Sequence, residues 1–84
     1  MNEYYERLDR LREMLEDRGF AARARELLIA ERSASTSGEA ISVTGVLLRQ
    51  IRESMNVAET DLRAELTEVL ELGQSLWDES NRSR

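Results

Sequence analysis

The sequence predicts an all-α protein, a small antiparallel bundle of four short helices with the third helix central. Apolar residues recur at helical spacing along most of the chain, proline is absent, and the only dense group of helix-breaking residues lies at 33–38. The 84 residues suffice for one domain. We expect that helical domain over residues 1–77, followed by a flexible polar C-terminal tail at 78–84.

The first helix is expected between Asn2, whose side chain can cap a helix, and Gly19. Its apolar stripe has spacings of 4, 3 and 4 and consists of Tyr4, Leu8, Leu11 and Leu15. Gly19 stands where a residue in the left-handed conformation commonly ends a helix.

A second helix should follow directly. Its shared apolar face consists of Phe20, Ala21, Ala24, Leu27 and Leu28. Ile29 points to the opposite side of this helix, so we expect it to be exposed.

The third helix is expected to begin at a capping box, with Thr36 as the N-cap and Glu39 at the third helical position, and to run to about Met55. Its main face consists of Ile41, Thr44, Leu48, Ile51 and Met55. Residues 41–48 are also rich in β-branched side chains, so a strand is the competing interpretation. A helix is favoured because the helical period continues to Met55 and no other segment could pair with a strand.

The fourth helix carries a stripe that consists of Leu62, Leu66, Val69 and Leu76. Residues 56–59 form a second capping-box pattern, which either kinks one long helix or separates the third helix from the fourth. Thr60 is an alternative cap.

Gly45 and Gly73 each interrupt a predicted helix, where glycine costs about 0.5–1 kcal/mol relative to alanine. The two positions predict a close approach of helices, or a ring such as that of Trp77 or Phe20 packed over the gap.

Composition argues against catalysis and against bound cofactors. The chain has no cysteine and no histidine, so it lacks the usual ligand sets for zinc, copper, haem and iron–sulfur clusters. Lysine is absent too, which leaves an activated serine without its usual base. No glycine-rich phosphate loop occurs. We therefore expect no enzyme activity, no metal and no cofactor.

The net charge of −5 argues against two kinds of partner. An acidic excess opposes binding to nucleic acid or to anionic lipid, and no apolar run approaches the ~20 residues of a membrane helix. The first residues lack the pattern of a signal peptide. Together with the absence of cysteine, these features lead us to expect a cytoplasmic protein.

The leading functional hypothesis is a non-catalytic protein–protein interaction module that forms a homodimer. A chain of this size buries only about 60% of its unfolded surface, so small domains often gain stability from a partner subunit. The first half of the third helix is apolar on nearly every side, which is typical of a helix buried on more than one side. The expected interface consists of Ile29, Val43, Val46 and Leu47.

The alternative hypothesis is a small acidic inhibitor, of the immunity-protein or antitoxin type, that masks a basic site on a partner protein. Residues 57–79 contain seven acidic side chains and one arginine. Asp61, Glu68 and Glu71 are expected on the outward side of the fourth helix, where no structural role requires them and they could steer a basic partner. Ordinary solvated surface patterning is the competing interpretation.

A third hypothesis concerns the loop before the third helix. Ser35, Thr36, Ser37 and Gly38 could bind an anion at the helix N-terminus, where free N–H groups and the helix dipole attract negative charge. Glu39 would repel such an anion, and a solvent-exposed cap is the competing interpretation.

Overall fold

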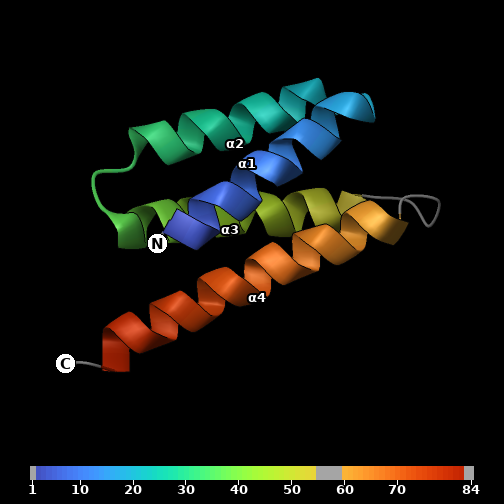
Figure 1. Ribbon diagram of the computed structural model, residues 1–84. Coiled ribbons are helices and arrows are strands. Elements are labelled where there is room, and N and C mark those ends of the chain that lie inside the picture. The colour runs from blue at the N-terminus through green and yellow to red at the C-terminus, as the bar shows by residue number, and fades with distance from the viewer. Residues whose placement is uncertain (1, 55–59, 83–84) are drawn as a thin grey trace.

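The computed structural model describes residues 2–54 and 60–82 (Figure 1). In that part of the chain it contains α1 (Asn2–Asp17), α2 (Ala21–Ser33), α3 (Ser37–Ser54) and α4 (Thr60–Arg82). These ranges contain no strand, so the predicted all-α class is confirmed. The strand interpretation of residues 41–48 is wrong because they lie within α3.

The four helices form an antiparallel ring in which each packs against two neighbours. Helices α1 and α3 each contact α2 and α4. They lie diagonally opposite one another and meet across the core, where the hydroxyl oxygens of Tyr4 and Thr44 are 2.7 Å apart. Helices α1 and α3 therefore each touch all three other helices, so α3 shares with α1 the central position that was predicted for it. Since α3 and α4 run in opposite directions (Figure 1), one long kinked helix is excluded.

The stripe predicted for the first helix forms the α1 side of the core. All four of its members, Tyr4, Leu8, Leu11 and Leu15, are buried. The helix ends where predicted, since Gly19 has a φ of +88° and the Phe20 N–H donates to the Leu15 carbonyl, with an N···O distance of 2.7 Å.

Helix α2 buries a narrower face than its sequence predicts. Ala24 and Leu27 lie in the core, Phe20 and Leu28 are half-buried, and Ala21 is exposed. Helix α2 therefore buries Ala24 and Leu27 in the core, whereas Ile29 on its opposite side is exposed.

The start of α3 confirms the predicted capping box. The Glu39 N–H donates to Oγ1 of Thr36 at 3.1 Å, and the Glu39 carboxylate accepts the Ser35 N–H at 3.3 Å. The carboxylate thus reaches one residue further back than the usual motif. The described main face of α3 is buried as predicted and consists of Ile41, Thr44, Leu48 and Ile51. Met55 and the capping pattern at 56–59 lie outside the described residues.

Helix α4 buries Leu62, Leu66 and Val69 and half-buries Leu76. It continues to Arg82, five residues beyond the predicted end of the domain at residue 77. Near this end of α4, Asp78 and Glu79 are exposed, as their polarity predicts. The flexibility of residues 78–84 stays a prediction.

Candidate functional site

The outer side of α3 carries two exposed apolar side chains. Val43 is 40% exposed and Val46 is 48% exposed. Because successive helical residues differ by about 100°, Val46 lies roughly opposite the buried Thr44 and Leu48. Leu47 is different, since it is half-buried and packs against the core. Of the four residues predicted as an interface, Val43 and Val46 therefore share one exposed side of α3.

Ile29, the fourth predicted interface residue, is 58% exposed on α2. Its exposure agrees with the sequence, but it does not line the groove described next. Whether Ile29 joins an interface with Val43 and Val46 stays a prediction.

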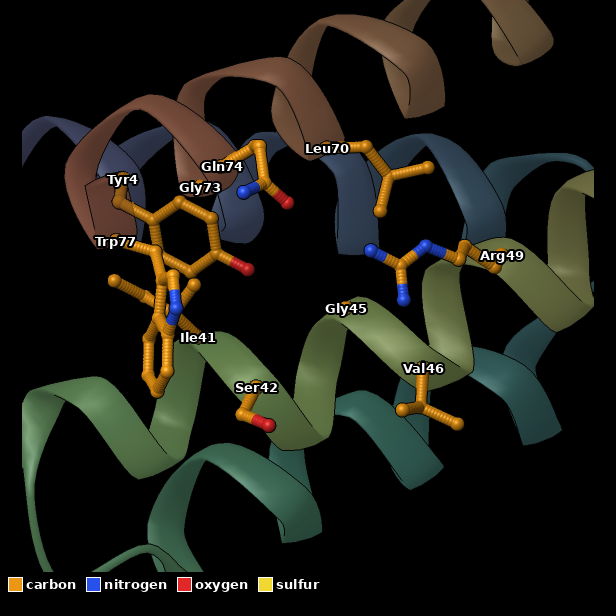
Figure 2. Close-up of a pocket in the computed structure, with 10 residues that line it drawn as sticks. All are labelled: Tyr4, Ile41, Ser42, Gly45, Val46, Arg49, Leu70, Gly73, Gln74 and Trp77. Atoms are coloured by element: carbon orange, nitrogen blue, oxygen red, sulfur yellow. The ribbon is translucent and has the colours of Figure 1, made fainter. Parts of the chain in front are cut away.

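A groove of about 270 Å³ lies between α3 and α4 (Figure 2). Arg49 and Leu70 lie at one end, Trp77 lies at the other, and Gly45 and Gln74 lie between them. The lining consists of Tyr4, Ile41, Ser42, Gly45, Val46, Arg49, Leu70, Gly73, Gln74 and Trp77. Val46 thus connects this groove with the exposed side of α3.

The two glycines of the groove differ in their surroundings. A Cβ atom at Gly73 would lie 2.9 Å from Cε1 of Tyr4 and 3.3 Å from Cγ2 of Ile41, so Gly73 permits a close approach, as predicted. The ring over the gap is that of Tyr4, whereas Trp77 packs on Gly38 instead. At Gly45 the prediction is wrong, because a Cβ there would meet no atom within 4 Å. Nothing within the monomer requires glycine at position 45.

A buried hydrogen-bond chain holds the Tyr4 ring at the floor of the groove. Oγ1 of Thr44 lies 2.6 Å from the carbonyl oxygen of Ala40, which can only accept. The Thr44 hydroxyl therefore donates to Ala40, and the Tyr4 hydroxyl donates to Thr44 at 2.7 Å. Burial raises the pKa of the Tyr4 hydroxyl. This ring is consequently a fixed, neutral wall of the groove.

Two polar side chains face the groove from opposite walls. Nε2 of Gln74 donates to Oδ1 of Asp78 at 3.1 Å. Arg49 is exposed and, within the described part of the chain, makes no hydrogen bond and no ion pair. Its guanidinium group keeps all of its donors for a partner.

The acidic residues predicted to form a face on α4 are largely paired with two arginines, Arg7 of α1 and Arg18, which directly follows α1. Arg7 pairs with both Glu65, at 3.1 Å, and Glu68. Arg18 donates to Asp61, with Nη1 2.8 Å from Oδ1, and lowers the pKa of that carboxyl to about 2. Asp61 and Glu68 therefore each have an ion-pair partner within the chain, although both side chains stay largely exposed.

Glu71 is exposed as predicted. The structure thus brings the three acidic residues onto one helix but does not present them together as an unpaired negative face. The partner-steering role of Asp61, Glu68 and Glu71 stays a prediction.

The Ser/Thr loop uses its polar groups within the chain. Thr36 caps α3 through its side chain and its carbonyl accepts the Ala40 N–H at 3.0 Å. Gly38 lies beneath the Trp77 ring, and the Glu39 carboxylate accepts the Ser35 N–H just before the start of α3. Ser35 and Ser37 are exposed. These contacts match the solvent-exposed cap better than an anion cradle.

A second hollow between α1 and α2 contains a poorly matched ion pair. Nη2 of Arg12 is 3.8 Å from Oε2 of Glu31, and neither that oxygen nor Nε of Arg12 has a hydrogen-bond partner within the described residues. Burial raises the pKa of the Glu31 carboxyl, while the charge of Arg12 opposes that rise. No sequence pattern indicates this pair, because it joins residues of two helices.

Comparison with known proteins gives no relative from which a function could be carried over. No family model, no curated protein and no solved structure matches the chain. Among the described side chains, no group of three or more carboxylates could bind a metal ion. Over its described length, no helix combines the extent and the apolar character that a membrane crossing requires.

Proposed function

We propose that this protein is a non-catalytic protein–protein interaction module that self-associates through the outer side of α3. The observation that carries the proposal is the exposure of Val43 and Val46, at 40% and 48%, on a helix whose opposite side is already buried. The core beneath them is complete, since Thr44 and Leu48 are fully buried. The exposed pair is therefore surplus to the monomer fold, and exposed apolar patches commonly mark interaction sites.

The non-catalytic part of the proposal rests on composition. Histidine, cysteine and lysine supply most nucleophile-activating and proton-transferring groups in enzymes, and the chain contains none of them. The same lack of cysteine suits a reducing compartment, so we place the protein in the cytoplasm. The acidic-inhibitor alternative has no comparable support, because Arg7 and Arg18 already pair with Glu68 and Asp61.

Sedimentation equilibrium at micromolar concentration tests this function. We expect a species of twice the chain mass of 9.7 kDa. Val46→Glu should give a monomer, because it places a charge in an apolar contact. Ala22→Glu, at an exposed position on α2, is the matched control and should still dimerise. A wild-type protein that stays monomeric throughout the concentration range would refute the proposal.

A further inference from the structure

The groove between α3 and α4 carries a single charge on an otherwise uncharged lining. Among the ten described residues that line it, Arg49 alone has a charged side chain. Arg49 is exposed and makes no hydrogen bond and no ion pair within the described part of the chain. A guanidinium group binds a carboxylate through two parallel N–H···O bonds. This end of the groove therefore complements a carboxylate.

The opposite end of the groove disfavours an anion and offers an aromatic surface. Trp77 lies there and is 39% exposed (Figure 2). The next residue, Asp78, accepts a hydrogen bond from Nε2 of Gln74 at 3.1 Å. The Asp78 carboxylate repels a second anion, whereas the indole ring favours another aromatic ring. Charge and ring thus orient a ligand in one direction, with its anion toward Arg49 and its apolar body toward Trp77.

The base of the groove leaves room for a ring. Gly45 is buried there, and a Cβ atom at this position would meet no atom within 4 Å. The neighbouring Tyr4 ring is held in place by its hydrogen bond to Thr44. Glycine within a helix costs stability relative to alanine. A ligand ring that lies against α3 accounts for a glycine that the monomer does not need.

The dimensions of the groove limit the size of its ligand. Arg49 lies seven residues after Ser42 on α3. Trp77 lies seven residues after Leu70 on α4. At about 1.5 Å of rise per residue, each wall is about 10 Å long. The volume of about 270 Å³ falls below the roughly 300–1,000 Å³ of sites for drug-sized ligands. A single ring joined to a carboxylate by a short chain fits both limits.

The groove is distinct from the surface proposed for self-association. By the helical period, Gly45 and Val43 point about 160° apart on α3, and Val46 lies between them. A ligand in the groove therefore leaves Val43 exposed. The two surfaces share only Val46, which lines the groove and is 48% exposed.

We propose that the groove between α3 and α4 binds a small aromatic monocarboxylate, with its carboxylate on Arg49 and its ring over Gly45, toward Trp77. This binding site goes beyond the proposed function and does not rest on it. One ion pair in an open groove gives a ligand of about a dozen non-hydrogen atoms a Kd of roughly 0.05–1 mM.

A titration with 3-phenylpropanoate, followed by two-dimensional ¹H–¹⁵N NMR, tests the site. The chain has one tryptophan and four glycines, so the signals of the Trp77 indole N–H and of the Gly45 and Gly73 amides can be assigned readily. We expect these three signals to shift saturably, with a Kd below about 1 mM. The neutral isostere 3-phenylpropanamide should bind about tenfold more weakly or worse, because it forms no ion pair.

Two variants separate the carboxylate contact from the apolar contact. Arg49→Gln should weaken the binding of 3-phenylpropanoate about tenfold and leave that of the amide unchanged. Arg63→Gln, the same change at an exposed position on α4 outside the lining, is the matched control and should affect neither. Gly45→Leu should weaken both ligands, because its side chain fills the groove. Circular dichroism of each variant checks its fold.

The outcomes decide between occupants of the groove. Saturable shifts that favour the acid and that Arg49→Gln weakens, but Arg63→Gln does not, support the inference. Absence of saturation at millimolar acid, or equal affinity for the acid and the amide, would overturn it. Shifts of Trp77 and Gly73 that depend on protein concentration without any acid would assign the groove to a second copy and overturn it too. A monomeric wild-type protein removes the proposed self-association and leaves this site standing.

Discussion

Replacing Gly73 with alanine should destabilise the protein, although alanine is the better helix former. The new Cβ would lie 2.9 Å from Cε1 of Tyr4 and 3.3 Å from Cγ2 of Ile41. Ordinary contact requires the ring to withdraw by about 0.5 Å. The ring cannot move freely, because its hydroxyl donates a buried hydrogen bond to Thr44.

Two opposing contributions set the magnitude. Alanine gains about 0.5–1 kcal/mol over glycine within a helix, whereas overpacking a filled core costs about 1–3 kcal/mol. The net expectation is a loss of about 1 kcal/mol in the free energy of unfolding. At Gly45, where no atom opposes the methyl group, the same substitution should instead gain about 0.5–1 kcal/mol.

Urea denaturation of both variants in a Val46→Glu background measures these effects without a contribution from self-association. A Gly73→Ala protein that gains as much stability as Gly45→Ala would refute the reasoning that Tyr4 confines this site. The hydrogen bond can be tested separately, since Gly73→Ala should cost less in a Tyr4→Phe background, where the ring is free to shift.

The ion pairs that Arg7 and Arg18 form with α4 lead to two further predictions. Arg18 lowers the pKa of the Asp61 carboxyl from 3.8 to about 2, so its ionised form stabilises the folded state above pH 3.8 and that contribution is lost as the pH falls through about 2. Asp61→Asn should therefore flatten this part of the curve of melting temperature against pH, and an unchanged acid slope would contradict it. Glu68→Gln should lower the free energy of unfolding by ~0.2–1 kcal/mol at low salt, because it removes a partner of Arg7, and the loss should vanish at high salt. Glu71→Gln is its control and should change stability little at either salt concentration.

Local sequence signals were sufficient to predict the ends of two helices. Gly19 marks the end of α1, and Thr36 with Glu39 marks the start of α3, because both devices act within a few residues of chain. Helical periodicity placed the buried stripes of α1 and α3 correctly for the same reason. Residues 78–82 were expected in a polar tail because they carry no apolar period, although they are helical.

The site depends on contacts between residues far apart in the chain, which periodicity does not encode. Arg7 is 58 residues from Glu65, so the neutralisation of the α4 acids could not be read from α4 alone. Gly45 and Gly73 are equivalent in sequence, each a glycine within a helix, and differ only because the Tyr4 ring lies over Gly73.

The contact between Trp77 and Gly38 provides an optical reporter of the seam between α3 and α4. Trp77 is the only tryptophan in the chain, it is 39% exposed, and a Cβ at Gly38 would lie 3.3 Å from its ring. Indole fluorescence depends on the polarity around the ring. The surroundings of Trp77 include Gly38 and the groove between α3 and α4. A local separation of α4 from the start of α3 would therefore shift the emission to longer wavelength while the far-ultraviolet helical signal persisted. Native-state opening at this seam can consequently be followed without attaching any label.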